Sequence, residues 1–218
     1  MNATRIALVG LVAAAALAAM PKRETVIDIH ASTRRFVIQT TLARVEDPIV
    51  VLGDSIVEAS TLPRSLCGHP VVNAGIGGAS TASDLGAMLS YALGGKRAAM
   101  IVVSLGLNDA AVNSVETFSS NYRALLAELA VLAPRRAVAA ISPPEAGLEQ
   151  SEKASTAVVD SYNAVLPALA REAGAAFIAL PAMPRQHTVD GIHLNAAGYE
   201  VWDGAILRGA ESGLCKIS

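Results

Sequence analysis

Apolar residues along this chain form two kinds of segment, short continuous runs and longer stretches in which they recur every three or four positions. Short runs rich in β-branched residues occur over residues 48–52, 71–73, 98–104, 137–141 and 175–178. A run of this length bounded by turn residues is typical of a buried strand. Helical patterns separate the runs, so the sequence predicts an α/β fold in which strands and helices alternate and the strands form a parallel sheet.

The helical period is clearest over residues 114–132. Seven apolar side chains fall there on one stripe, namely Val115, Phe118, Tyr122, Leu125, Leu126, Leu129 and Leu132. Ser114 stands where an N-cap residue belongs, and Pro134 follows the last apolar position. This segment is therefore predicted to be an amphipathic helix.

Two further helices are expected in the last third of the chain. The first covers residues 153–172 and is ended by Gly174, with Pro167 inside it as a candidate kink. The second covers residues 196–209, with Asn195 as its N-cap.

The first twenty residues have the pattern of a targeting segment. Arg5 precedes an uncharged apolar run over residues 6–20, which suits the hydrophobic region of a signal peptide and is short for a membrane span. Residues 16–18 read Ala-Leu-Ala and fit a signal-peptidase site, so a mature chain would begin near residue 19. Lys22 and Arg23 place positive charge on the other flank, and an uncleaved membrane anchor is the alternative. We expect an exported protein, periplasmic or secreted, that is either free or tethered through residues 6–20.

Composition narrows the range of partners. The chain has 218 residues, 52% of them hydrophobic, which is enough for one substantial core. Its net charge is −2 without a basic stripe, and only 4% of its residues are aromatic, so nucleic acid is not expected as a partner. No paired Cys or His at zinc-ligand spacing accompanies Cys67 or Cys215, and neither a metal nor an organic cofactor is expected.

The two cysteines, Cys67 and Cys215, lie far apart in the sequence. In an oxidising compartment they would form one disulfide that closes a long loop. The alternative is two separate buried thiols, because the sequence does not show whether their Cβ atoms meet.

Two short motifs at opposite ends of the chain supply a nucleophile, a general base and a carboxylate. Residues 53–55 read Gly-Asp-Ser, and residues 190–193 read Asp-Gly-Ile-His. A serine hydroxyl keeps its proton near neutral pH, so Ser55 needs an imidazole such as His193 to take that proton. The imidazole in turn needs an anion on its other ring nitrogen, and Asp190 is spaced to lie beside it on a tight turn. These residue types are the parts of a serine hydrolase.

Other polar residues follow the second and third apolar runs. Glycines occupy positions 75, 77 and 78, and Asn108 comes after the run that ends at Ser104. The carboxyl ends of parallel strands meet at one edge of a sheet, so these segments should lie beside Ser55. The backbone N–H of Ser55, that of a glycine and the Asn108 amide could together bind an oxyanion.

Each motif also has a simpler interpretation. Gly-Asp-Ser is an ordinary turn and helix cap, in which Asp54 would bond nearby amides. The glycine-rich stretch resembles a dinucleotide loop, although Ser80 stands where its third glycine belongs. Asn108 and Asp109 could form only a turn. Arg185 and His187, which precede Asp190, would either line the substrate entrance or simply lie in a solvated loop.

Taken together, four blocks resemble those of the GDSL, or SGNH, hydrolases. They are Gly53-Asp54-Ser55, Asn73-Ala74-Gly75-Ile76-Gly77-Gly78, Gly106-Leu107-Asn108-Asp109 and Asp190-Gly191-Ile192-His193, within residues 48–207. The resemblance implies a three-layer α/β/α, flavodoxin-like fold and esterase, lipase or acetyl-ester hydrolase activity. It also implies that Ser55 is the nucleophile, Gly78 and Asn108 are oxyanion donors, and Asp190 and His193 complete the triad. Ile56 stands where the family's leucine would be, and Gly75 or Gly77 remain alternatives to Gly78.

We therefore divide the chain into a signal peptide or anchor over residues 1–20, a helical extension over 21–47 and a hydrolase domain over 48–218. The expected activity is hydrolysis of carboxylic esters by acyl transfer to Ser55, without a cofactor. Either a short acyl ester, such as an O-acetyl group on a glycan, or a lipid-like ester would suit the leader and the fold. The alternative is a catalytically weak carbohydrate- or lipid-binding envelope protein on the same fold.

Overall fold

The computed structural model describes residues 26–215, with side chains from residue 29 onward. The apolar run over residues 6–20 and its candidate cleavage site lie outside this range. The chain divides into a unit of residues 1–32 and a unit of residues 33–218, and the sheet and the candidate site belong to the second. Within the described range no helix is both long and apolar enough to cross a membrane.

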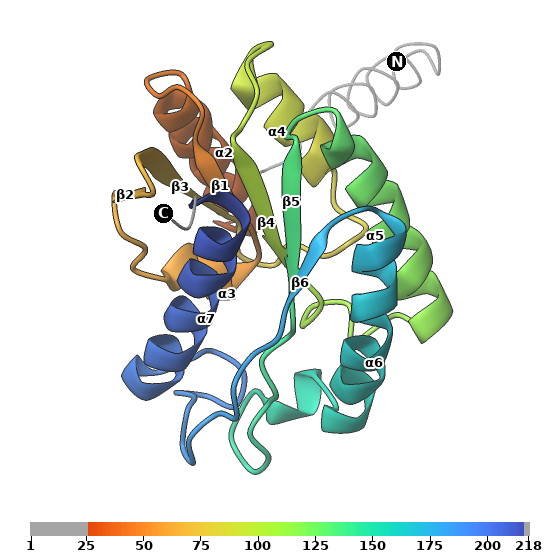
Figure 1. The fold of residues 1–218 in the computed structure, drawn as a ribbon. Helices are drawn as coiled ribbons and strands as arrows, with labels where there is room; N and C mark the ends of the chain where they lie inside the picture. The colour runs from red at the N-terminus through yellow and green to blue at the C-terminus, as the bar shows by residue number, and fades with distance from the viewer. Residues whose placement is uncertain (1–25, 216–218) are drawn as a thin grey trace, which may run out of the picture. The chain divides into compact units, whose positions relative to one another are not determined.

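A six-stranded sheet forms the middle of the second unit (Figure 1). Its strands are β1 (Ile49–Gly53), β2 (Ser65–Leu66), β3 (His69–Gly75), β4 (Met100–Ser104), β5 (Arg135–Ala139) and β6 (Ala176–Ile178), in the spatial order β2-β3-β1-β4-β5-β6. The last five strands of this order are parallel and have the 2-1-3-4-5 arrangement of a flavodoxin-like sheet. Each contains most of an apolar run that predicted it. The two-residue β2 was not predicted, and it pairs antiparallel with β3 at the edge.

Helices cover both faces of the sheet. They are α2 (Val26–Leu42), α3 (Ser55–Ala59), α4 (Leu85–Leu93), α5 (Val115–Ala130), α6 (Thr156–Glu172) and α7 (Ala196–Leu214), with a 3-10 turn at Ser151–Lys153. Figure 1 shows α4, α5 and α6 on one side and α3 and α7 on the other, which is the three-layer architecture that the resemblance implies. The core between these layers includes Trp202, Tyr122, Tyr162 and Phe118, all fully buried.

Helix α7 is longer than the sequence predicts. The prediction ended it at Gly209, but the helix continues to Leu214. A Cβ atom at Gly209 would lie 2.4 Å from Cδ1 of Ile178 in β6, and one at Gly213 would lie 3.1 Å from Cε of Met100 in β4. These glycines therefore allow α7 to pack closely on the sheet and do not end it.

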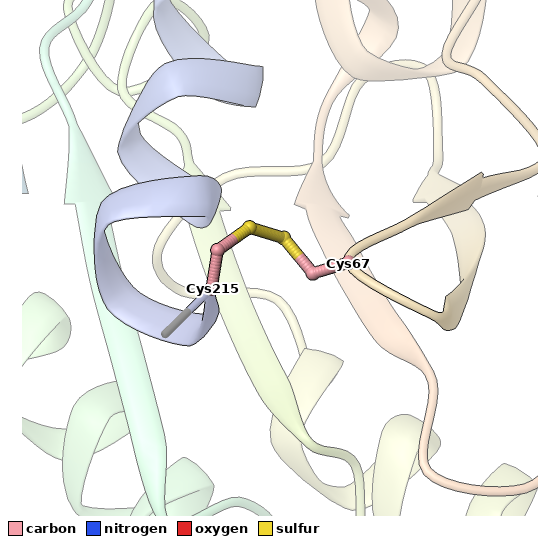
Figure 2. Close-up of a disulfide and its surroundings, with 2 residues drawn as sticks. All are labelled: Cys67 and Cys215. Carbon is pink, nitrogen blue, oxygen red and sulfur yellow. A yellow bond between two sulfur atoms is a disulfide. The ribbon is translucent and has the colours of Figure 1, made fainter. Parts of the chain in front are cut away.

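A disulfide joins Cys67 and Cys215 across 148 residues (Figure 2). Cys67 follows β2, and Cys215 is the C-cap of α7. The bond ties the edge of the sheet to the end of α7 that lies farthest from His193. A cross-link that closes so long a loop restricts the unfolded chain strongly.

Candidate active site

The turn after β1 carries the candidate nucleophile. Gly53 ends β1, Asp54 is the N-cap of α3, and Ser55 is the first residue of that helix. A Cβ atom at Gly53 would lie 2.3 Å from the carbonyl oxygen of Ser104 on β4, so only glycine allows this close approach. The register sets Gly53 opposite Gly75 and Ser104, which brings the ends of the three central strands to one level.

Asp54 has the structural role that the sequence suggests. Its side chain is buried, and its Oδ1 atom accepts a hydrogen bond of 2.9 Å from the N–H of Ile56, which caps α3. Burial raises the pKa of Asp54 to about 7, although the Ile56 hydrogen bond and the nearby His193 oppose that shift.

Ser55, His193 and Asp190 form one hydrogen-bonded line. The Oγ atom of Ser55 lies 3.0 Å from Nε2 of His193, and Nδ1 of His193 lies 2.6 Å from Oδ2 of Asp190. The other carboxylate oxygen of Asp190 accepts hydrogen bonds from the backbone N–H groups of Ile192 and His193. Burial alone would raise the pKa of Asp190, but these bonds outweigh it and lower the pKa below its ordinary value. Asp190 is therefore an anion that can hold the imidazole in one orientation.

The loop that carries Asp190 and His193 is held by Glu145, which lies in the loop after β5. The Oε2 atom of Glu145 accepts hydrogen bonds from the backbone N–H, at 2.7 Å, and the hydroxyl of Thr188. That hydroxyl also accepts a bond of 3.1 Å from the N–H of Gly191. Backbone bonds join the same two loops, from Glu145 N–H to Gly191 O and from Gln150 N–H to Asp190 O. All five of these bonds end within two residues of Asp190 or on it.

His187 neither lines the substrate entrance nor lies in a solvated loop, so both expectations for this residue were wrong. Only 6% of the residue is exposed, while Arg185 is exposed. Its ring nitrogens lie 3.0 Å from the carbonyl oxygen of Pro184 and 2.9 Å from that of Pro143. The ring thus fastens the loop before Asp190 to the loop after β5.

The glycine-rich loop after β3 offers one backbone donor. The N–H of Gly75 donates to Oδ1 of Asn73 at 3.0 Å, and the N–H of Gly77 donates to Oε2 of Glu58 at 2.6 Å. Gly78, by contrast, is exposed, and within the described part of the chain its N–H donates no hydrogen bond. Its φ of +79° suits glycine. Of the three glycines considered from the sequence, Gly78 is therefore the one with a free donor.

Asn108 faces the same loop from the end of β4. Its Nδ2 atom donates a bond of 2.8 Å to the carbonyl oxygen of Ala79, which orients the amide and leaves a second N–H on the same nitrogen. The neighbouring Asp109 is completely buried and accepts hydrogen bonds from the N–H and hydroxyl of Thr81 and from the amide of Asn113. Asp109 is thus more than a turn residue, because it fastens the loop after β4 to the glycine-rich loop.

Several residues around the site carry no signal in the sequence. Arg34, Glu145 and Thr188 belong to no motif, and each acts through contacts with segments distant along the chain. Over residues 26–215 no cluster of three His, Cys, Asp or Glu side chains could hold a metal ion.

Comparison with known proteins places the chain among ester hydrolases. A family model described as GDSL-like Lipase/Acylhydrolase family matches residues 51–201, which include all four sequence blocks. A search of curated proteins finds no match.

Solved structures share the fold. A structure described as a putative platelet activating factor from Streptococcus pneumonia has a TM-score of 0.70 at 22% identity, covering 94% of this chain and 98% of the other. A lipase/acylhydrolase from Enterococcus faecalis has a TM-score of 0.60 at 20% identity, covering 76% and 95%. A catalytic mutant of an acetylxylan esterase from Geobacillus stearothermophilus has a TM-score of 0.59 at 18% identity, covering 75% and 93%. At these identities the likeness establishes the α/β fold.

Proposed function

This chain belongs to the GDSL-like lipase/acylhydrolase family and is a carboxylic ester hydrolase, and from that premise we propose that Ser55, His193 and Asp190 are its catalytic triad. The observation that carries the proposal is the continuous line from Ser55 Oγ through the His193 ring to the Asp190 carboxylate, with distances of 3.0 and 2.6 Å. Both contacts lie within the range needed for proton transfer and for holding the base.

In the first half of the reaction Ser55 Oγ attacks the carbonyl carbon of the ester. His193 Nε2 takes the serine proton, and Asp190 stabilises the imidazolium that results. The tetrahedral intermediate then breaks the bond to the alcohol oxygen, which leaves with the proton from His193. In the second half a water molecule attacks the acyl group on Ser55 and gives a proton to His193. The bond between the acyl carbon and Ser55 Oγ then breaks, His193 returns the proton to Oγ, and the acid and the free serine are released.

The negative oxygen of each intermediate would be bound by three donors. They are the N–H of Ser55 at the start of α3, the N–H of Gly78 and the side-chain amide of Asn108. The first N–H groups of a helix have no partner within the helix, and the Gly78 N–H likewise has no acceptor among residues 26–215. The Ala79 carbonyl holds the Asn108 amide in place, so this donor does not have to reorganise during the reaction.

We propose short acyl esters, such as O-acetyl groups on glycans, as the substrates. Long acyl chains need a cover or groove, and the loops after β5 and before α7 are bonded to each other by Glu145, Gln150 and their partners. These bonds argue against either loop opening and closing as a lid over a long acyl chain. The fold is shared with an acetylxylan esterase, which agrees with this substrate class.

The test is hydrolysis of p-nitrophenyl esters from acetate to palmitate by the domain without its leader. We expect the highest kcat/KM for acetate or butyrate, and a loss of at least about 10³-fold in Ser55→Ala, in His193→Ala and in the double variant alike, because the two residues act as one unit. Asp190→Asn should lose about as much. Equal rates in wild type and Ser55→Ala would overturn the triad, and an optimum at palmitate would overturn the substrate class.

We further propose that the protein is exported and acts in the periplasm or outside the cell, free or tethered through residues 6–20. The Cys67–Cys215 disulfide supports this, because such bonds persist in oxidising compartments. Fractionation of cells that produce the full chain tests it. Recovery in the cytosol with two free thiols would contradict it, and recovery in the membrane fraction at full length would show the anchor.

A further inference from the structure

An ion pair links helix α2 to the helix that begins with Ser55. The Nε atom of Arg34 lies 3.3 Å from Oε1 of Glu58, and both side chains are 19% exposed. Arg34 precedes the segment that matches the family model, whereas Glu58 lies on α3, three residues after Ser55. The pair therefore brings a residue from outside the matched segment next to the catalytic turn.

Glu58 also holds the glycine-rich loop. Its second oxygen, Oε2, accepts a hydrogen bond of 2.6 Å from the N–H of Gly77, the residue directly before Gly78. A short bond from an N–H to a carboxylate is among the stronger hydrogen bonds in proteins. It fixes the peptide plane that precedes Gly77, so that the next peptide unit, which carries the Gly78 N–H, starts from a defined orientation.

Arg34 reaches the other end of the same loop. Its Nε donates to the carbonyl oxygen of Gly75 at 3.0 Å, and its Nη2 lies 3.3 Å from Oδ1 of Asn73. The Asn73 amide in turn donates to the carbonyl oxygen of Val57 on α3 at 2.6 Å. Arg34 and Glu58 thus connect α3 to the loop at both Gly75 and Gly77.

We propose that Arg34 and Glu58 are positioning residues for the oxyanion hole, which hold the Gly78 N–H at a constant distance from the Ser55 N–H. The inference rests on the proposed function, since it assigns a purpose to the donors named there. An oxyanion donor works only when it is preorganised, and a displacement of about 1 Å can lower the rate about 10²-fold. The two donors sit on different elements, the start of α3 and the loop after β3, so a link between these elements is what keeps their spacing.

The nature of the side chains suits this task. The guanidinium is planar and carries several N–H donors, so it can contact Glu58, Gly75 and Asn73 at once. A lysine in its place would keep the charge but would contact them as a single point. The low exposure of both partners protects the pair from the solvent screening that weakens surface ion pairs.

The experiment compares Arg34→Ala, Glu58→Ala and the double variant with Arg35→Ala as the matched control. Arg35 is the next residue of α2 and forms an exposed ion pair with Asp84, the N-cap of α4. We expect kcat and kcat/KM for p-nitrophenyl acetate to fall together by about 10-fold in each single variant, with KM changed less than about 2-fold. The double variant should be no slower than the slower single one, because both act through one loop. Arg35→Ala should keep its rate.

Two conservative variants separate positioning from simple stability. Arg34→Lys should recover part of the lost kcat, and Glu58→Gln, which keeps an oxygen acceptor for Gly77 N–H, should be faster than Glu58→Ala. A change in KM alone, an equal loss in Arg35→Ala, or multiplied losses in the double variant would overturn the inference. If Ser55→Ala kept wild-type activity, the proposed function would fail instead, whatever Arg34→Ala did.

Discussion

The two halves of the candidate site are held in place by different means. Ser55, Gly78 and Asn108 stand just beyond the ends of β1, β3 and β4, which are neighbours in the sheet. Asp190 and His193 lie in the loop that leads from β6 to α7. Since β6 lies three strands from β1, about 14 Å at the usual spacing, this loop must return past the ends of β5 and β4 to reach Ser55.

The difference shows where precision comes from in each half. Strand register places the nucleophile and the oxyanion donors, and Asp109, Arg34 and Glu58 then connect their loops. The base half has no strand to place it, so side chains and backbone groups of two loops do this work through Glu145, His187 and Thr188. We expect changes in the nucleophile half to act directly on the transition state, and changes in the loop contacts to act more weakly through the position of His193.

Outside the triad, the largest effect is expected at Asn108. Asn108→Ala removes one oxyanion donor and should lower kcat by about 10²–10³-fold with little change in KM, because the donor acts mainly in the transition state. Steady-state kinetics on p-nitrophenyl acetate measures this, with circular dichroism to confirm folding. A loss below about 3-fold would mean that Asn108 only supports the Ala79 carbonyl.

A smaller effect is expected from the loop contacts of the base half. Hydrogen bonds from Thr188 outweigh the effect of burial and lower the pKa of Glu145, so this carboxylate is held as an anion. Glu145→Ala should lower kcat by about 10-fold and speed amide hydrogen exchange over residues 187–193, because the N–H and the hydroxyl of Thr188 lose their acceptor. Glu149→Ala, an exposed glutamate of the same loop, is the control. Unchanged exchange in Glu145→Ala would contradict the role of this contact.

The disulfide should affect stability and spare both halves of the site. Replacing Cys67 and Cys215 with serine should lower the free energy of unfolding by about 2–5 kcal/mol, since the bond closes a loop across 148 residues. The rate at 25 °C should stay within about 2-fold of wild type, as the bond lies at the far end of α7 from His193. Urea denaturation and ester hydrolysis measure the two quantities, and a rate loss matching Asn108→Ala would refute the separation.

The last prediction concerns the pH dependence of stability through Asp54. Its pKa is about 7 in the folded protein against 3.8 for the free side chain, so between these values the folded state holds a proton that the unfolded state has lost. The contribution of Asp54 to stability should therefore fall as the pH rises from about 4 to 7, by at most about 1.4 kcal/mol per pH unit, and level off above pH 7.

The control is Asp54→Asn, which keeps an oxygen to cap α3 and has no proton to lose. The difference in unfolding free energy between wild type and this variant, measured in urea from pH 4.5 to 8, should show the fall. A constant difference over that range would show that Asp54 ionises normally despite its burial.

The sequence predicted most of the elements, and its misses have physical reasons. The parallel strands were found from their continuous apolar runs and α5 from its apolar period, because both signals are local, and Ser114 and Asn195 do cap α5 and α7. Helix α4 was not predicted. The two-residue strand β2 is too short to have a period, and the end of α7 was misplaced because Gly209 serves packing against Ile178.

What the sequence determined by itself is the order of strands and helices and the motifs at the strand ends, because periodicity, capping and turn chemistry depend on residues near one another in the chain. Tertiary structure decided which glycine has a free N–H, since Asn73 and Glu58 occupy the donors of Gly75 and Gly77. It also decided the contacts of Arg34, Glu145 and His187. Those contacts join segments that are distant in sequence, and a hydrogen bond between them has no local pattern from which it could be predicted.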